Sequence, residues 1–359
     1  MSRLHSAHRQ AQGFVLVLVL AMLVVLSLLA GSIAGVTARL RDQAQFRQTR
    51  LNDSIDIAST RATLLYLLNT QRMTVGGITV DRNVSFGESG VRAIESDDDL
   101  MSVLPIGNEI AMDGRTNQGL GAVRFAVQDE RGLFGVNWSP TRSLQLLLNQ
   151  TNEPTKIPPQ TLINRLLDYQ DPDDLYRLNS MEANGYRSAG LPPPSNRRLA
   201  TPMELFRVAG WTEALGFLTP AELNDTISLE DTSVININTA PARVLLTIDG
   251  MNPELVGRIM ARRKVQPFMT ETALFEFLGM RTSSDRGVAV YPAASGTLKL
   301  WSANGGQVSL VHWTLTHLED GQPPWREDYE LIQSQYRSES DTVYPVASWL
   351  FSKQVAAKR

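Results

Sequence analysis

Five carboxylates lie close together in one stretch of the chain and have the chemistry of a divalent-cation site. Within LINRLLDYQDPDDLYRLNSMEANGY they are Asp168, Asp171, Asp173, Asp174 and Glu182. Hard carboxylate oxygens clustered in a loop suit Ca²⁺. The spacing is not that of an EF-hand, because Pro172 interrupts it and the glycine of the sixth loop position is missing. Two interpretations stay open: a Ca²⁺ site, or a solvated acidic turn that caps the structure that follows.

A second candidate site is a helical hairpin in VININTAPARVLLTIDGMNPELVGRIMARRKVQPF, residues 234–268. We expect helices over 241–248 and 253–264 on either side of the turn Asp249-Gly250-Met251. Such helix-hairpin-helix units bind nucleic-acid phosphate through backbone N–H groups and the helix dipole. The basic residues Arg258, Arg262, Arg263 and Lys264 follow the turn.

Two features favour a structural hairpin over a nucleic-acid site. The DNA-binding form has a second glycine two positions after the first, and this chain has Asn252 there. The 34 basic and 37 acidic side chains are also nearly balanced, which gives no global footprint for nucleic acid. We therefore expect no nucleic-acid partner, and a membrane-anchored DNA receptor stays the alternative.

The rest of the composition offers little for catalysis. The chain has no cysteine and only four histidines, which are His5, His8, His312 and His317. A thiol nucleophile or cysteine metal site therefore cannot exist, and a histidine-rich catalytic metal site has too few ligands. No Ser-His-Asp, His-x-x-x-His or phosphate-loop pattern is present. We predict that the protein is not an enzyme.

The N-terminus has the pattern of a membrane anchor. Residues 14–36 are overwhelmingly apolar, and no residue between Arg9 and Arg39 carries a formal charge. Roughly 23 residues at about 1.5 Å rise span a hydrocarbon core of about 30 Å. Arg3 and Arg9 precede the span without an acidic residue, so the positive-inside rule places residues 1–13 in the cytoplasm. A signal sequence cleaved near Ala30 or Ala34 is an open alternative.

The apolar span continues into an amphipathic helix. From Val36 to Val75 there is neither glycine nor proline. Apolar residues recur at spacings of three, four and seven, which predicts one helix over about 14–69 with an amphipathic second half. The residues of that stripe are Leu40, Ala44, Leu51, Ile55, Ala58, Ala62 and Leu65.

The remaining chain reads as strands, then helices, then strands. Strands are expected within 75–86 and 121–136, again from about 287 around the turn Asn304-Gly305-Gly306, and over 329–335. Between them, about 140–279 carries helix start signals at Thr201-Pro202, Thr219-Pro220, Asn238 to Pro241 and Asn252-Pro253. We expect one sheet interrupted by a compact helical insertion.

The N-terminal pattern resembles that of type IV pilins. A short basic leader ends at Gly13, and Phe14 opens the apolar helix, as at a prepilin peptidase site. The resemblance implies cleavage after Gly13 and N-methylation of Phe14. Most pilins carry glutamate at the fifth mature position, where Leu18 stands here. A carboxylate inside a membrane is costly without a partner, so its absence fits a subunit with none ahead of it, or a protein outside the fibre.

Three features in order resemble the general secretion pathway protein K family of minor pseudopilins. They are the Gly-Phe site without the glutamate, the acidic block LLDYQDPDD and the motif N-I-N-T-A-P followed by a hairpin. The resemblance implies structural Ca²⁺ at the five carboxylates named above. Tyr169 replaces the usual tryptophan, and the stretch Met181-Glu182-Ala183-Asn184 departs from the expected acidic run.

The resemblance also implies an α+β fold and a domain plan. We expect a leader over 1–13, a transmembrane helix over 14–36, a stalk helix over 37–70 and a tail over 341–359. Residues 71–140 and 285–340 would form a pilin-like α/β domain with an antiparallel sheet, interrupted by an all-α insertion over 141–284 that contains the hairpin.

The implied function is that of a tip subunit of the type II secretion pseudopilus, which initiates and caps fibre assembly. Implied partners are other minor pseudopilins, the prepilin peptidase and the inner-membrane assembly platform. The chain would be anchored once in the inner membrane, with the N-terminus cytoplasmic and most of its mass periplasmic. A minor pilin of a true type IV pilus is a further alternative.

Overall fold

The computed structural model describes residues 7–80, 103–150, 156–231, 233–280, 287–316, 321, 323–334 and 342–352. The chain divides into two compact units, Met1–Ile55 and Asp56–Arg359. The expected end of the first strand at Phe86, the acidic loop at residues 97–99, the histidine at 317 and the final basic residues lie outside the described part.

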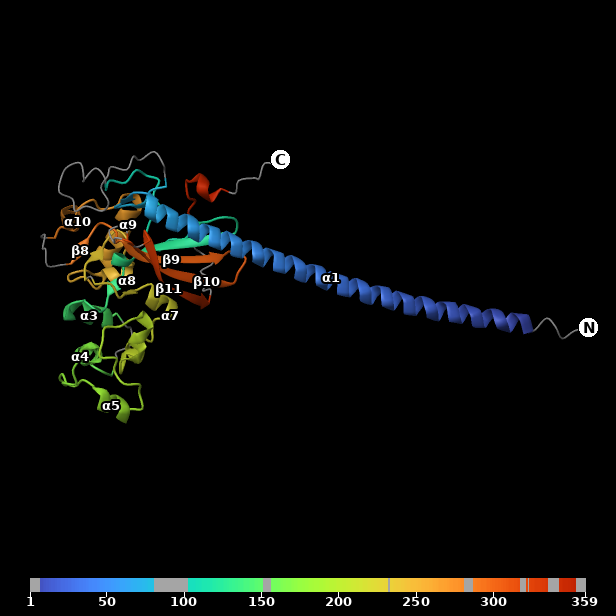
Figure 1. The fold of residues 1–359 in the computed structure, drawn as a ribbon, viewed down its shortest axis with the longest axis horizontal. Helices are drawn as coiled ribbons and strands as arrows, with labels where there is room; N and C mark the ends of the chain where they lie inside the picture. The colour runs from blue at the N-terminus through green and yellow to red at the C-terminus, as the bar shows by residue number, and fades with distance from the viewer. Residues whose placement is uncertain are drawn as a thin grey trace, which may run out of the picture. The chain divides into compact units, whose positions relative to one another are not determined.

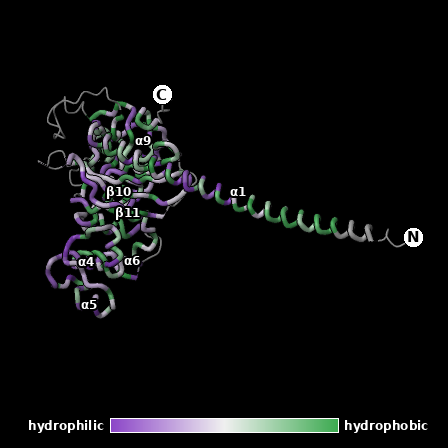
Figure 2. Tube along the Cα trace, turned by 45° about the vertical axis from the view of Figure 1, so that its right-hand side comes forward, coloured by the Kyte–Doolittle hydropathy of each residue, from purple (hydrophilic) through white to green (hydrophobic). Residues whose placement is uncertain are grey.

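A single long helix, α1, runs from Ala7 to Thr70 over 64 residues (Figure 1). This confirms the continuous helix expected over 14–69. Residues 15–36 are predominantly apolar, as Figure 2 shows, and they are exposed. Among the described residues, α1 is the one helix whose length and composition suit a membrane span. The length and hydropathy of this helix are therefore those of a membrane anchor.

The last turns of α1 belong to the second unit and pack on a sheet. Leu64 and Leu67 are fully buried among residues of the strands. Thr60 accepts a hydrogen bond from the backbone N–H of Leu120 at 3.2 Å. The apolar stripe is not covered over its whole length, since Leu40 and Leu51 are exposed in this chain. A stripe seen in sequence shows which face is apolar, but it does not show what covers that face.

The sheet has five strands in the order β11-β10-β9-β4-β3. Their bounds are Trp325–Ser334, Gln307–Leu315, Ser295–Ser302, Val123–Asp129 and Asn117–Gln118, and all neighbouring pairs are antiparallel. Strands from before and after the helical block therefore share one sheet, as the sequence predicted. A short hairpin of β1, Met73–Thr74, and β2, Gly77–Ile78, follows α1.

The insertion leaves the sheet at the end of a hairpin. Strands β4 and β9 are antiparallel neighbours whose pairing runs from Val123 with Ser302 to Asp129 with Gly296. A tight turn would ordinarily join such strands. Here the whole helical block stands where that turn would be. The sheet can therefore form its register without contributions from the insertion.

The insertion is mostly helical and has its own hydrophobic core. Its longer helices are α3, Thr141–Leu148, α4, Pro159–Gln170, α9, Pro253–Val265, and α10, Glu271–Leu278. Shorter elements are η1, Glu130–Gly132, α5, Ala183–Ser188, η2, Pro202–Arg207, α6, Trp211–Ala214, α7, Pro220–Asn224, and α8, Ala242–Leu245. Trp211, Tyr186 and Phe275 are fully buried in this core, and α1 contributes nothing to it.

The expectation of an all-α insertion is wrong in one respect. Two short parallel strand pairs lie in or at the edge of it. They join β5, Phe134–Gly135, to β6, Ile227–Ser228, and β7, Ile235–Asn236, to β8, Val288–Ala289. The core of the insertion accordingly begins near Phe134, several residues before the expected boundary. Runs of two residues carry too little periodicity to be read from a sequence.

The expected helix starts differ in outcome. Thr219 forms a capping box with Glu222, and Asn252 accepts from the N–H of Leu255, so both predictions are confirmed. The capping box at Thr201 is wrong, because its side chain makes no cap and η2 is a 3-10 helix. Its Glu204 instead bonds to Arg197 and to the backbone N–H of Ala200.

Part of the expected tail packs on the sheet. Phe351, in the 3-10 helix η4, Trp349–Phe351, stacks on Phe125 of β4 with ring centroids 5.5 Å apart. Tyr344 bridges to Asn117 of β3 in a parallel sense. Val346, Leu350 and Phe351 therefore pack against the sheet's core, although the sequence pattern left this segment outside the domain.

Candidate metal centre

Helix α4 positions two of the five candidate carboxylates. Its apolar residues Leu162, Ile163 and Leu166 face the core of the insertion. Asp168 follows on the same buried side in the last turn, and Asp171 is the C-cap, with its backbone N–H bonded to the carbonyl of Leu167. Helical periodicity therefore explains why an aspartate lies at the edge of an apolar core.

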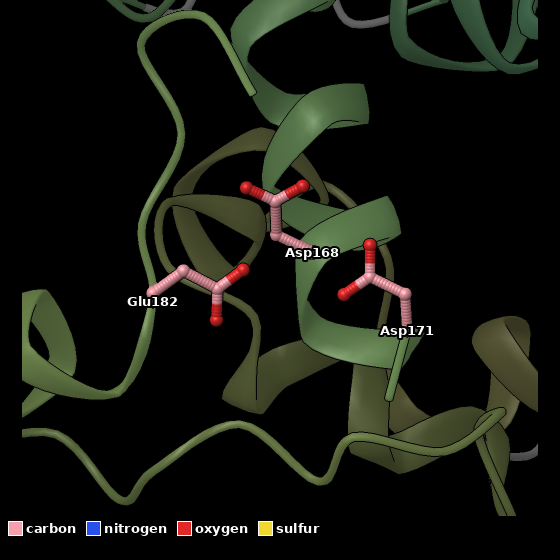
Figure 3. A group of neighbouring side chains, drawn as sticks. All are labelled: Asp168, Asp171 and Glu182. Carbon is pink, nitrogen blue, oxygen red and sulfur yellow. The ribbon is translucent and has the colours of Figure 1, made fainter. Parts of the chain in front are cut away.

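Glu182 approaches the same place from the other side. It is the residue before α5, and its carboxylate points toward Asp168 in Figure 3. The candidate ligand oxygens of Asp168, Asp171 and Glu182 all lie within 4.8 Å of one another. Asp168 and Glu182 are 0% and 1% exposed. Three of the five predicted residues are thus brought together.

The other two predicted residues lie outside the cluster. Asp173 accepts a hydrogen bond from the backbone N–H of Leu175 at 2.8 Å, which is a local turn. Asp174 is exposed and is not among the grouped ligands. Asn184, considered as an amide ligand, is exposed and accepts from Arg187. Spacing alone could not separate these residues from the three that converge.

No hydrogen-bond donor among the described residues compensates the negative charge of Glu182. Both of its carboxylate oxygens are buried and lack a hydrogen-bond partner among the described residues. Burial first, and then the charges of Asp168 and Asp171, raise the pKa of Glu182 to about 7. A buried unpaired carboxylate is unfavourable unless a cation or proton neutralises it. The arrangement thus calls for a positive ligand.

The donor set fits a calcium ion. Ca²⁺ binds oxygen ligands at about 2.3–2.6 Å, so ligands on opposite sides of one ion lie up to roughly 5 Å apart. One oxygen from each of these carboxylates lies within 4.8 Å of the others, which is inside that limit. Asp171 Oδ1 is a further buried oxygen without a partner. Asp168, Asp171 and Glu182 are therefore the residues that would hold the ion.

The sequence analysis missed Arg177. Its guanidinium Nη1 lies against Asp168 Oδ1 and also against Asp171 Oδ2. Its backbone N–H donates to Asp168 Oδ2 at 3.0 Å. Hydrogen bonds to both aspartates raise the pKa of Arg177. A basic residue three positions after an acidic run was available as a signal, since opposite charges at loop spacing often pair.

Tyr169, which stands where the family pattern has tryptophan, is itself part of α4 and lies in the core of the insertion. Its ring is buried and lies 6.0 Å from that of Tyr186. Its hydroxyl donates to Glu204 Oε1 at 3.4 Å. The substitution therefore keeps an aromatic residue in the core beside the acidic cluster.

Asp129 is a second buried carboxylate that the sequence analysis did not single out. It ends β4 and accepts four hydrogen bonds from three segments. The donors are the N–H of Arg131 at 3.2 Å, Asn236 Nδ2 at 2.9 Å, Thr239 Oγ1 at 2.7 Å and the N–H of Ala293 at 2.7 Å. Burial nevertheless raises the pKa of Asp129 to about 6. This residue joins both ends of the insertion to its interior.

The N-I-N-T-A-P motif is the inner half of that junction. Asn236 and Thr239 donate to Asp129, as above. Asn238 donates to the carbonyls of Phe268 and Val290 and accepts from the N–H of Phe268. Each polar side chain of the motif thus has a structural partner.

The arginines of the hairpin bond to backbone carbonyls. Arg263 Nη1 donates to Ile237 and Ala240, Arg258 to Phe277, and Arg262 to Gln266. Burial lowers the pKa of Arg263 to about 10, which leaves it cationic at neutral pH. The first helix of the expected hairpin is short, since α8 covers only Ala242–Leu245. The helix-hairpin-helix therefore stays a prediction from the sequence.

A cavity of about 410 Å³ lies between the sheet and the insertion. At its wall His312 of β10 contacts Glu130 Oε2 at 3.2 Å and Asp328 Oδ2 at 2.7 Å. Burial alone would lower the pKa of His312, but hydrogen bonds and charges of Glu130 and Asp328 outweigh burial and raise it. The ring of Tyr329 stacks on His312. This network ties the start of the insertion to the outer strands.

The predicted cleavage site lies within α1. Gly13 and Phe14 are part of its helical backbone, and Leu18 follows one turn later. Leu18 is exposed in this chain, with no described residue packed over it. Cleavage and methylation at this site stay predictions.

Solved structures include chains that are similar to this one. No family model and no curated protein matches the chain. A chain in the crystal structure of the GspK-GspI-GspJ complex from the enterotoxigenic Escherichia coli type 2 secretion system is similar to it. That chain is 14% identical, the match covers 83% of this chain and 100% of that chain, and the TM-score is 0.44. Likeness of this degree does not establish membership of a family.

Proposed function

We propose that the protein is a minor pseudopilin of a type II secretion system and occupies the tip of the pseudopilus. The observation that carries the proposal is the architecture of α1 and the sheet. One unbroken helix is apolar on all sides over residues 14–36 and ends packed on an antiparallel sheet. Such a helix suits a subunit that is stored in a membrane and packs beside others in a fibre.

Two features of this chain support the tip position. Leu18 stands where a fibre subunit would place a glutamate toward the subunit ahead of it. The insertion, which replaces the turn between β4 and β9, adds a bulky domain to an otherwise small sheet domain. A subunit with this domain initiates assembly and prevents further subunits from adding above it. Its role is structural, without catalysis.

The partners and location follow from the same role. Apolar residues of α1 outside the predicted span, such as Leu40, Phe46 and Leu51, are exposed in this chain and would pack against stalk helices of other minor pseudopilins. The prepilin peptidase would cut after Gly13, and the inner-membrane assembly platform would receive the mature chain. The N-terminus would be cytoplasmic and the sheet and insertion periplasmic.

Calcium would be a structural cofactor in this role. It would neutralise Glu182 and join α4 to the loop before α5 at Asp168 and Asp171. An ion that binds only the folded chain stabilises it by about 2.7 kcal/mol at a concentration a hundred times Kd. The insertion would therefore be most stable in a compartment that contains calcium.

The direct test is to locate the protein on its fibre. An affinity-tagged chain is expressed in a host whose own copy of the gene is deleted, and sheared pseudopili are labelled with gold against the tag. We expect label at fibre ends, recovery of other minor pseudopilins with the tagged chain, and secretion that depends on the gene. Label along the whole fibre would indicate an ordinary pilus subunit instead, and absence of label would rule out a fibre role.

A second variant tests the capping role of the insertion. Residues 131–294 are replaced by an Asn-Gly turn, since Asp129 and Gly296 are already paired across β4 and β9. We expect this chain to be processed and incorporated but to leave fibre length unrestricted. Normal fibre length with this variant would show that the insertion does not cap.

A further inference from the structure

We propose that Arg177 is an internal counter-ion of the acidic centre, and that Ca²⁺ binds there by displacing its guanidinium group. The inference rests on the calcium site included in the proposed function and adds how that site is regulated. Metal-free protein would hold Arg177 between Asp168 and Asp171, and metal-bound protein would release it to solvent.

The guanidinium group and a metal ion would compete for the same two carboxylates. Nη1 of Arg177 contacts one oxygen of Asp168 and one oxygen of Asp171. Those residues, with Glu182, are also the group whose oxygens lie within 4.8 Å of one another. A bound Ca²⁺ requires contact with these oxygens at about 2.3–2.6 Å, which leaves no room for a guanidinium nitrogen between them.

Arg177 alone does not complete the centre. No contact joins its guanidinium to Glu182, whose two buried oxygens have no partner among the described residues. Figure 3 shows the Glu182 carboxylate directed toward the same space as Asp168. One monovalent group thus neutralises part of a three-carboxylate site, and the remaining negative charge still attracts a divalent ion.

Of the ion pair between Arg177 and Asp168, only the arginine side chain can move away from the centre. The side chain of Arg177 is 40% exposed, whereas that of Asp168 is 0% exposed. A long, half-exposed arginine can swing into water without losing hydration, and a buried aspartate at the end of α4 cannot. Displacement therefore costs little beyond the ion pair itself.

Displacement would also remove one of the attachments of the loop after α4. The backbone N–H of Arg177 is bound to Asp168 Oδ2 independently of its side chain. The neighbours Leu175 and Leu178 are 75% and 80% exposed. Metal binding would thus exchange a side-chain attachment of this exposed loop for a metal-centred one.

Calcium titration of arginine variants tests the inference. Full-length protein in detergent is titrated with CaCl₂ by calorimetry, as wild type, Arg177→Gln and Arg187→Gln. Arg187 lies on α5 and bonds to Asn184, so its substitution removes an equal charge without touching the centre. We expect Arg177→Gln to bind Ca²⁺ roughly tenfold tighter or more, since a positive charge in contact with two ligands is removed. Arg187→Gln should stay within about twofold of wild type.

Melting temperatures distinguish competition between Arg177 and Ca²⁺ from a purely structural role of Arg177. In chelator Arg177→Gln should melt below wild type, and in millimolar Ca²⁺ the gain in its melting temperature should exceed that of wild type. Equal or weaker calcium binding by Arg177→Gln would overturn the inference. Arg177→Lys, which keeps the charge but not the planar donor, should bind with intermediate affinity. It provides the test should the glutamine variant fail to fold, and affinity no tighter than wild type would count against the inference.

The remaining outcomes are also decisive. Binding by Arg177→Gln but not by wild type would mean that the arginine permanently replaces the ion, which would overturn the displacement. Absence of binding in every variant would overturn both the displacement and the calcium site. The pseudopilin assignment would then stand or fall on gold labelling alone, so the two failures are distinguishable.

Discussion

At the scale of single residues, Glu182 is a carboxylate in an environment that is unfavourable for its charge. A carboxylate with both oxygens buried and unpartnered is unfavourable in the metal-free protein, and two neighbouring aspartates increase that cost. The same feature makes it the ligand that would gain most from a cation. Its substitution should therefore have opposite effects with and without calcium.

We predict that Glu182→Gln stabilises the protein in chelator at neutral pH by about 1–3 kcal/mol, because a buried negative charge is removed. In millimolar Ca²⁺ the order should reverse, since wild type gains binding energy that the variant lacks. Thermal melts in both conditions provide the measurement. Glu213→Gln, on the exposed face of α6, is the matched control and should behave as wild type in both. A variant less stable than wild type in chelator would contradict the prediction.

His312 gives a prediction in pH. Because Glu130 and Asp328 raise its folded pKa above the ordinary value of about 6.5, the protonated ring stabilises the fold. That stabilisation is fully present below the unfolded pKa and is lost as pH rises through the folded pKa. We expect His312→Gln to cost roughly 1–2 kcal/mol at pH 6 and clearly less at pH 9. Equal losses at the two pH values in denaturant melts would show that protonation of His312 contributes nothing.

The sequence predicted the role of a single residue only in part, because that role depends on the residues around it in the fold. The carboxylates of Asp168, Asp171 and Glu182 converge as predicted, whereas Asp173 and Asp174 face a turn and solvent. Nothing in the acidic run separates these two groups. Their difference arises because α4 ends at Gln170, which places residues before and just after that point toward the core.

At the scale of elements, the junction between β4 and the insertion determines how two domains share one chain. Asp129 collects donors from η1, from the N-I-N-T-A-P motif and from the segment that leads into β9. The motif therefore holds the two ends of the insertion together, and the spacing of its polar residues has a structural explanation. The sequence indicated that the motif was specific but did not reveal its partner.

We predict that Asp129→Ala destabilises the protein by about 3 kcal/mol or more, because four donors lose their acceptor in a buried site. Asp225→Ala is the control, since Asp225 pairs with Lys299 near the surface and should cost less than about 1 kcal/mol. Urea unfolding of both variants gives the comparison. Similar losses in the two variants would show that the junction carries no special stability.

The helix start signals in the sequence predicted the capping bonds correctly only where no stronger partner competed for the capping side chains. Thr219 and Glu222 form their capping box at the surface. Glu204, at the equivalent position after Thr201, is buried and bonds to Arg197 instead. A charge-assisted bond to arginine outweighs a neutral cap. The prediction of a helix start at Thr201 was therefore correct in position, but the predicted capping bonds were wrong.

At the scale of the whole molecule, α1 joins the predicted membrane span to the sheet without a break. We predict that Gly13→Leu blocks maturation, because a prepilin peptidase requires the small residue before its cut. Mass spectrometry of the N-terminus should find mature wild type beginning at methylated Phe14 and the variant retaining residues 1–13. Gly31→Ala, at a position with open space around it, should mature normally. A processed Gly13 variant would contradict the prepilin prediction.

The sequence by itself determined the features that depend on neighbours along the chain. The apolar composition of residues 14–36 and the absence of glycine and proline from Val36 to Val75 determined α1, and alternation of side chains determined β9, β10 and β11. Only tertiary structure decided which distant groups meet. It placed Arg177 on the acidic centre, Asp129 on the N-I-N-T-A-P motif and residues 342–352 on the sheet. The physical reason is that periodicity records which face of an element is apolar, whereas pairing of buried charges depends on how separate elements pack.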